Sequence, residues 1–345
     1  MDRRLFLQAA GALGVAAALG PTRIALAERP AGAVSADQLP TLDGALTLYL
    51  GRGEGGLYED VVAAIRERNP ALDLSIRRGP SAALANTLVA EAGAGVRRAD
   101  LFWAIDAGSL GLVAAGGMAR VVPADITEQL RPEFRFSDWT AISGRIRTVA
   151  YNPERVDPDA LPTDIMAFAD SDYRIGWAPA YGAFQSFLTA MRLLEGDAAT
   201  RQWLEGVEPR ATEYAGELGA VMAVTRGEVD LAFANHYYTL RLKQGMPDAP
   251  VALHFTKDDA GCLVNASGVV VLGPGDTPEN FVRYLLTREV QSYLAREAFE
   301  LPLVPGVPGP TGLPPMAQID PPKLDLTRLA DLRPTLALMR EAGVL

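Results

Sequence analysis

Cysteine is nearly absent from this sequence, since the 345 residues contain only Cys262. A single cysteine forms no disulfide within its own chain, and Cys262 lies too far from the N-terminus to carry a lipid anchor there. We interpret it as a buried packing residue, because no paired histidine motif accompanies it. The fold must therefore be stabilised by packing and hydrogen bonds.

Long apolar runs are also scarce. The run Ala9–Leu19 is shorter than the about 20 residues that span a bilayer, and Pro21 interrupts the chain just after it. The run comes after Arg3–Arg4–Leu5–Phe6–Leu7, and the segment ends near Ala25–Leu26–Ala27. This pattern is typical of a cleavable export signal over residues 1–27, and the paired arginines favour the twin-arginine (Tat) route. We expect an exported protein that is soluble after cleavage.

Positive charge is too scarce for a protein that binds nucleic acid. The chain has 32 lysine and arginine residues against 42 aspartate and glutamate residues, a formal net charge of −10. This balance favours a freely diffusing protein, which we expect to be a monomer without nucleic acid as a partner. The sequence also lacks a nucleophile elbow, a phosphate-binding loop, a zinc-binding helix and spaced cysteine ligands, so we do not expect an enzyme.

Strand and helix patterns alternate after a leader rich in Pro, Ala and Gly, residues 28–40. Apolar alternation predicts strands, and amphipathic spacing predicts helices, in the following segments. The strands are Leu46–Leu50, Leu72–Ile76 and Asp100–Ile105, and the helices are Leu57–Arg68 and Ala82–Ala94. This order predicts an α/β fold with a mixed, mostly parallel sheet flanked by helices.

A second α/β series comes next. Its strands are Arg145–Tyr151, Ile175–Pro179 and Val229–Ala234, and its helix is Phe184–Leu194. A strand at Gly268–Leu272 and helices at Pro278–Leu286 and Val290–Phe299 then return to the first series. We predict lobe 1 from residues 41–140 and 265–315, lobe 2 from residues 141–264, crossing hinge strands between them, and residues 316–345 packing on the lobes. A ligand is expected at the strand ends that face the crevice.

Two consecutive tyrosines, Tyr237 and Tyr238, stand at the predicted turn after Val229–Ala234. At a strand-to-helix turn both phenols can project into a cleft, where a trivalent cation removes their protons despite an ordinary pKa of about 10. Hard phenolate oxygens suit a hard ferric ion. The dipeptide alone favours a different interpretation, in which the two rings plug the end of the sheet.

The sequence around these tyrosines resembles the ferric-ion-binding periplasmic proteins of bacterial ABC importers. Asn235–His236–Tyr237–Tyr238 carries the resemblance, and further similar stretches come in the family's order. These are Leu48–Arg52, Ala99–Trp103, Trp139–Arg147, Gly176–Pro179, Leu301–Val307 and Glu341–Leu345. The resemblance implies a two-lobed periplasmic binding protein of type II, which captures Fe(3+) as cargo in the periplasm and delivers it to an ABC permease in the inner membrane.

The same resemblance implies the metal ligands. The family's paired tyrosines bind iron, and this role is carried over to Tyr237 and Tyr238. One branch adds a histidine and a glutamate, but Gly53 and Ile105 stand at those places here, and neither can coordinate iron. A tyrosine-rich branch adds a third phenolate after a Pro-containing strand. Its place here is Tyr181, which becomes the third expected ligand.

A synergistic anion is also implied. Family members that use phosphate have a small polar residue at the place of Tyr181 and an asparagine at that of Glu217, so the resemblance favours carbonate over phosphate. Guanidinium groups suit a planar oxyanion. The candidate anion-binding residues are Arg52, Arg145, Arg147 and Asn235. Arg145 and Arg147 share one strand face, and pairing with a surface carboxylate stays an alternative for at least one of them.

Four other polar residues have competing interpretations. Asp106 comes after the third strand as a candidate ligand, although an N-cap for the next helix is favoured. Glu217 is a candidate ligand or, as favoured, a solvated surface charge. His236 and His254 are expected to be structural.

Two further functions keep the same fold. Related binding proteins carry a phosphonate, thiamine, a polyamine, an oxyanion or a ferric chelate, because a fold alone does not determine function. An accessory protein that senses iron is the other alternative. The tyrosine pair argues against neutral or cationic organic ligands, which need no phenolates.

Overall fold

The computed structural model of the chain describes residues 32–51 and 56–345. The predicted export signal, together with Arg52 and Gly53, lies outside these described residues. In the described chain, no helix is long and apolar enough to cross a membrane.

A mixed sheet runs through the whole molecule in the strand order β2-β1-β3-β9-β4-β7-β5-β6, with β8 and β10 paired to β4. The strands are β1 (Gly44–Gly51), β2 (Leu72–Gly79), β3 (Leu101–Ala104), β4 (Thr140–Tyr151), β5 (Ile175–Trp177), β6 (Ala211–Glu213), β7 (Leu231–Asn235), β8 (Ala252–His254), β9 (Val264–Val271) and β10 (Leu301–Pro302). The predicted α/β fold with helices around a mixed sheet is confirmed, but the sheet is not mostly parallel, because β4 and β9 pair antiparallel with their neighbours.

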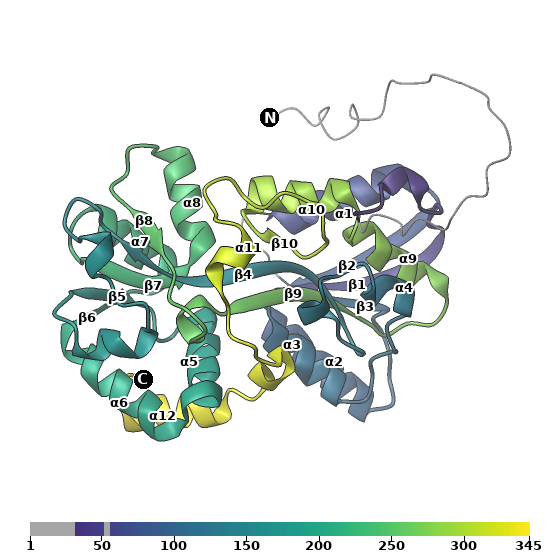
Figure 1. Cartoon of the computed structure of the whole chain (residues 1–345). Coiled ribbons are helices and arrows are strands. Elements are labelled where there is room, and N and C mark those ends of the chain that lie inside the picture. The colour runs from purple at the N-terminus through teal and green to yellow at the C-terminus, as the bar shows by residue number, and fades with distance from the viewer. Residues whose placement is uncertain (1–31, 52–55) are drawn as a thin grey trace, which may run out of the picture.

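Helices cover both faces of this sheet, with α2 and α3 opposite α1 and α10 in one half and α5 and α6 opposite α7 and α8 in the other (Figure 1). They are α1 (Leu57–Arg68), α2 (Ser81–Gly93), α3 (Ala107–Ala115), α4 (Ala124–Thr127), α5 (Gly182–Glu195), α6 (Asp197–Val207), α7 (Glu217–Thr225), α8 (His236–Gly245), α9 (Asp276–Leu285), α10 (Arg288–Tyr293), α11 (Met316–Ile319) and α12 (Arg333–Glu341). Their apolar faces pack on the sheet, which is where burial stabilises the fold.

One predicted helix differs from the structure. The sequence predicts a single helix over Val290–Phe299, but α10 ends at Tyr293 and a wider π-helical turn, Leu294–Ala298, comes after it. Phe299 then takes a left-handed backbone conformation with φ 55° and ends the helical segment. Glu300, the next residue, is buried and accepts a hydrogen bond from Arg145.

Two long strands connect the halves of the molecule (Figure 1). Strand β4 pairs antiparallel with β9 from Thr140 to Ile146 and with β7 from Arg147 to Tyr151. Strand β9 in turn pairs with β3. The chain therefore crosses between the halves along β4 and returns along β9, while the lobe boundaries stay a prediction.

The C-terminal segment contacts both halves. The 3-10 helix Leu326–Ala330 packs on α3, and a Cβ atom on Gly111 would lie 2.9 Å from the Thr327 carbonyl oxygen, so this close approach needs glycine. Helix α12 packs on α5, where the buried hydroxyls of Thr335 and Thr189 lie 2.8 Å apart. The segment thus joins α3 to α5 at one edge of the space between the halves.

Candidate metal centre

The three predicted tyrosine ligands meet at one edge of the sheet. Tyr181 comes after β5 as the N-cap of α5, and Tyr237 and Tyr238 lie in the first turn of α8, directly after β7. Strands β5 and β7 are parallel neighbours, so their carboxyl ends emerge side by side. The hydroxyl oxygens of Tyr181 and Tyr238 are 2.9 Å apart, and the rings of Tyr237 and Tyr238 have centroids 4.4 Å apart.

The position of these phenols at two helix N-termini favours negative charge. Helix α5 begins immediately after Tyr181, and α8 begins at His236. The unpaired N–H groups and peptide dipoles at a helix N-terminus attract anions. The guanidinium of Arg241 also lies over the ring of Tyr237, 4.8 Å from its centroid. Two helix N-termini and one guanidinium group therefore lie close to the tyrosine-bearing turns.

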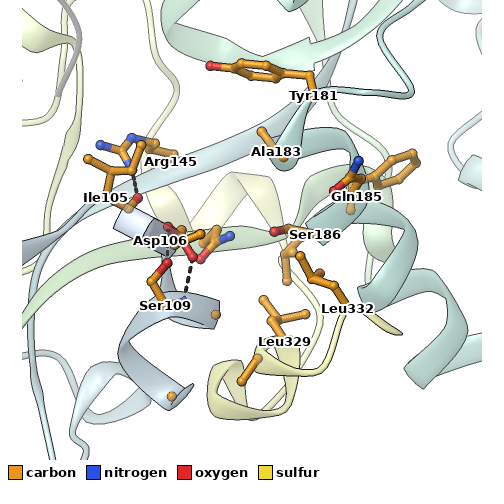
Figure 2. A pocket seen from close by; sticks show the side chains of 18 of the residues that line it. Ile105, Asp106, Ser109, Arg145, Tyr181, Ala183, Gln185, Ser186, Leu329 and Leu332 are labelled. Atoms are coloured by element: carbon orange, nitrogen blue, oxygen red, sulfur yellow. Dashed lines mark hydrogen bonds between the residues drawn. The ribbon is translucent and has the colours of Figure 1, made fainter. Parts of the chain in front are cut away.

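A cleft of about 930 Å³ opens next to the tyrosines. Tyr181 and Tyr237 line it together with Arg145 and Asn235. Figure 2 shows Tyr181 and Arg145 towards one end of the cleft, and Leu329 and Leu332 of the C-terminal segment towards the other. Tyr238 is 5% exposed and contacts this group through its hydrogen bond with Tyr181.

Arg145 is held against the first half of the molecule. Its guanidinium donates hydrogen bonds to the carbonyl of Ile105, to the Tyr58 hydroxyl at 2.8 Å and to Glu300 at 2.7 Å. Burial works to lower the pKa of Arg145, but the charges of Glu300, Tyr58 and Tyr237 outweigh it and raise that pKa well above its ordinary value. Arg145 thus stays charged beside the cleft with a carboxylate partner of its own, and that partner is buried.

Arg147 and Glu217 form a second buried pair. Arg147 donates to one oxygen of Glu217 and, at 2.8 Å, to the carbonyl of Phe233. The expectation that Glu217 is a solvated surface charge is wrong, because its side chain is 0% exposed. The local sequence gives no sign of a partner on a strand 70 residues away. Both arginines therefore have internal carboxylate partners.

Asp106 is a helix cap, as its sequence context favours. Its side chain accepts hydrogen bonds from the backbone N–H of Ser109 at 2.7 Å and from the Ser109 hydroxyl at 3.0 Å. Burial raises the pKa of Asp106 above its ordinary value, although these hydrogen bonds oppose the shift. The residue also lines the cleft, with both oxygens engaged by Ser109 (Figure 2).

The two histidines and the cysteine have structural environments, as expected. His236 accepts the N–H of Ile146 at 3.0 Å and lies 2.6 Å from the carbonyl of Phe299, and burial lowers its pKa to about 4, so the ring is neutral. His254 donates to the carbonyl of Pro162 at 2.8 Å. Cys262 is buried, and burial raises its thiol pKa to about 11.

Carboxylate, imidazole and thiolate groups do not gather into a metal site in the described chain. No group of three or more His, Cys, Asp or Glu residues there could hold a metal ion. Softer or divalent metals usually bind through such sets. Among the described residues, the convergent phenols are thus the donor set that suits a hard trivalent cation.

Sequence reasoning missed three residues around this centre. Tyr58 and Glu300 surround Arg145, but one lies on the amphipathic helix α1 and the other after a π-helical turn, so no local pattern marks them. The spacing between Tyr237 and Arg241 in the sequence could have identified Arg241. Arg241 stands four residues after Tyr237 on α8, a spacing that places two helical side chains on the same face.

Comparisons with known proteins identify relatives of this chain. No protein-family model matches the chain. The chain is 31% identical over 258 residues to the major ferric iron-binding protein of Neisseria meningitidis, covering 71% of this chain and 78% of that protein. It is 28% identical over 289 residues to the Fe(3+)-binding periplasmic protein of Serratia marcescens, covering 81% and 85%.

A comparison with solved structures also finds an iron-bound protein. Iron-bound HitA from Pseudomonas aeruginosa matches with a TM-score of 0.78 and 29% identity, covering 88% of this chain and 100% of that one. The two relatives found by sequence are named as iron-binding proteins, and this solved structure contains bound iron. The extent of the shared sequence and the shared fold establish that the chain belongs to the family of bacterial periplasmic ferric iron-binding proteins, with a periplasmic binding protein fold of type II.

Proposed function

We propose that this protein captures ferric iron in the periplasm through the phenolates of Tyr181, Tyr237 and Tyr238 and delivers it to an ABC permease in the inner membrane. The observation that carries the proposal is the contact between the Tyr181 and Tyr238 hydroxyls, 2.9 Å apart at the edge of the cleft. Residues from two separate strand-to-helix turns meet there. Such convergence suits a small ion that needs several donors at once.

The chemistry is proton loss in exchange for metal coordination. A free phenol has a pKa of about 10, but a bound metal ion changes this balance and holds the phenolate at neutral pH. Three phenolates supply three negative charges, which equal the charge of the ferric ion. The helix N-termini at α5 and α8 favour the negative charges that form when the metal binds.

The remaining coordination positions are assigned to a small oxyanion, and we propose carbonate in preference to phosphate. The groups proposed to hold it are the helix N-termini, Asn235, Arg145, whose side chain lines the cleft, and Arg52. Arg147 already has Glu217 as its partner. Asp106 and Glu217 stay outside the proposed coordination sphere, because Ser109 engages the first and Arg147 and Asn235 engage the second.

A ferric chelate is the second candidate cargo. The cleft volume of about 930 Å³ lies within the range of about 300–1,000 Å³ that small organic ligands occupy. An ion with one small anion fills only a fraction of such a space. Closure of the two halves around the ion would reduce this volume. A ferric ion with one small anion therefore requires more closure than a ferric chelate does.

Visible absorption tests the proposal. Purified protein without its signal is titrated with ferric citrate, and a phenolate-to-iron charge-transfer band is expected to grow with iron bound. Gallium(III), a trivalent ion without this band, serves as the control and should compete for the same site. An iron-bound protein without colour would exclude the tyrosine ligands.

A further inference from the structure

Glu217 lies beneath the tyrosine-bearing turn and has no exposed surface. It is the first residue of α7. One of its carboxylate oxygens contacts Arg147, and the other accepts the backbone N–H of Asn235 at 2.9 Å. Asn235 is the last residue of β7 and directly precedes the helix that carries the tyrosine pair. Glu217 thus holds the main chain immediately before the proposed ligands.

Asn235 links this carboxylate to a phenol. It occupies the N-cap position of α8, yet its side chain makes no capping hydrogen bond. Its Nδ2 atom lies instead 3.5 Å from the hydroxyl oxygen of Tyr237. The backbone of Asn235 is therefore held by Glu217, while its side chain faces the tyrosine hydroxyl.

Arg147 completes the arrangement from strand β4. Besides Glu217, it donates to the carbonyl of Phe233 at 2.8 Å, and its guanidinium lies 4.7 Å from the ring centroid of Phe187. The pair therefore contacts the end of β7 at two places, Phe233 and Asn235. Three elements, β4, α7 and β7, are joined directly below the turn to α8.

We propose that Glu217 is a positioning residue for iron binding, which holds the turn from β7 to α8 so that Tyr237 and Tyr238 face the metal, and which also serves as the internal counter-anion of Arg147. This inference rests on the proposed tyrosine site. Residues that orient metal ligands through hydrogen bonds typically change metal affinity by about 10- to 100-fold when they are replaced. A ligand set that is already in place also loses less conformational freedom on binding.

The positioning role can be separated from a contribution to stability. Removing one member of a buried ion pair leaves an unpaired charge and destabilises the fold, whereas replacing both members with apolar residues is often neutral. Two double variants use this difference. Arg147→Met with Glu217→Leu removes both charges and also the acceptor for Asn235. Arg147→Met with Glu217→Gln removes both charges but keeps an amide oxygen for the Asn235 N–H.

Iron affinity is measured by competition with citrate, the charge-transfer band is recorded at saturating iron, and thermal stability is measured without iron. We expect the leucine double variant to bind iron about 10- to 100-fold more weakly than wild type with a shifted band. The glutamine double variant should stay within a few-fold of wild type. The glutamine double variant should respond to added bicarbonate as wild type does, because it lacks Arg147 but keeps the acceptor for the Asn235 N–H.

Three results would overturn the inference. Equal iron affinity in wild type and both double variants would show that the turn needs no acceptor at Glu217. Equal losses of affinity in both double variants would also overturn it: losses that track thermal stability would reduce the pair to a structural element, and losses that do not track it would make Glu217 itself a ligand. A wild-type protein that binds ferric ion without a charge-transfer band would remove the tyrosine site and this role with it.

Discussion

The hydroxyl oxygens of Tyr181 and Tyr238 lie 2.9 Å apart, although 57 residues separate the two tyrosines in the chain. At this distance one phenol donates a hydrogen bond to the other, so the pair is already assembled before an ion arrives. In the proposed site, a trivalent cation would displace the protons of both phenols and bind the two phenolate oxygens. The contact therefore connects the fold to the proposed chemistry, and it makes the individual hydroxyls testable.

Replacing Tyr237 or Tyr238 with Phe should weaken iron binding far more than it weakens the fold. Each variant keeps the buried ring but loses a charged ligand. We therefore expect iron affinity to fall by more than about 100-fold, which is the largest loss usual when a residue that only orients a metal ligand is replaced. The lost hydroxyl contact should lower the melting temperature by only about 2–4 °C. Citrate competition and thermal unfolding measure the two effects.

Tyr284→Phe is the matched control. Tyr284 is also buried, and its hydroxyl donates to the carbonyl of Pro40 at 3.0 Å, away from the cleft. This variant should lose a similar amount of thermal stability and keep wild-type iron affinity. Proportional losses of affinity and stability in all three variants would mean that the tyrosines only pack at the end of the sheet.

Bicarbonate should strengthen iron retention more than phosphate does. A planar carbonate fits between a guanidinium edge and helix N–H groups, and Glu217 is engaged by Arg147 and Asn235, where it offers no donor to phosphate. We predict that iron is lost faster to citrate in bicarbonate-free buffer, and that phosphate restores less of the retention. Stronger retention with phosphate would contradict the carbonate assignment.

Iron should make the protein more compact. The two halves are joined by β4 and β9, and the proposed ligands lie on one half, so closure brings groups from the other half over the ion. Small-angle scattering should show a smaller radius of gyration with ferric ion. Arg52→Ala should reduce this change while the charge-transfer band persists. No change in wild type would argue against closure, and an unchanged response in Arg52→Ala would remove Arg52 from it.

His254 should make stability depend on pH in the mildly acidic range. Burial lowers its pKa below the ordinary value of about 6.5, although the hydrogen bond with Pro162 opposes the shift. The unfolded chain then binds more protons than the folded one as pH falls below that value, so the free energy of unfolding decreases towards acid. His254→Gln keeps a donor for the Pro162 carbonyl but cannot titrate.

Urea unfolding at about pH 7.5 and about pH 5.5 tests this expectation. The difference in unfolding free energy between the two pH values should be smaller in His254→Gln than in wild type. Part of the dependence should remain, because the pKa of His236 is also lowered, to about 4. An identical difference in both proteins would show that His254 does not contribute.

Local sequence patterns predict helices and strands well where apolar residues recur at regular spacing. The helix Leu57–Arg68 has the predicted bounds, because its apolar residues recur at helical spacing. For strand β4 the pattern predicts only the part from Arg145 onwards, but the strand begins at Thr140. Its first part contains Ser143 and Gly144, which have no strand signature, and pairing with β9 and β10 keeps this part extended.

The candidate site was predictable only in part, for a physical reason. The three tyrosines could be named from strand-to-helix turns and the family resemblance, and the structure brings Tyr181 and Tyr238 into contact. The partners of Arg145 and Arg147 could not be named. Ion pairs between distant elements depend on which side chains the fold buries together, and local sequence patterns do not predict those contacts.

The place of β9 in the sheet has a consequence for how the chain is made. Strand β9 lies between β3 and β4, and Leu101 pairs with Val271, so the middle of the sheet is supplied by one of the last strands to be synthesised. Until then, β3 has an open edge, and such edges promote association with other chains. Pairing between segments so far apart in sequence is slow to form. The half of the molecule that contains β1, β2 and β3 therefore completes its folding only after most of the polypeptide has left the ribosome.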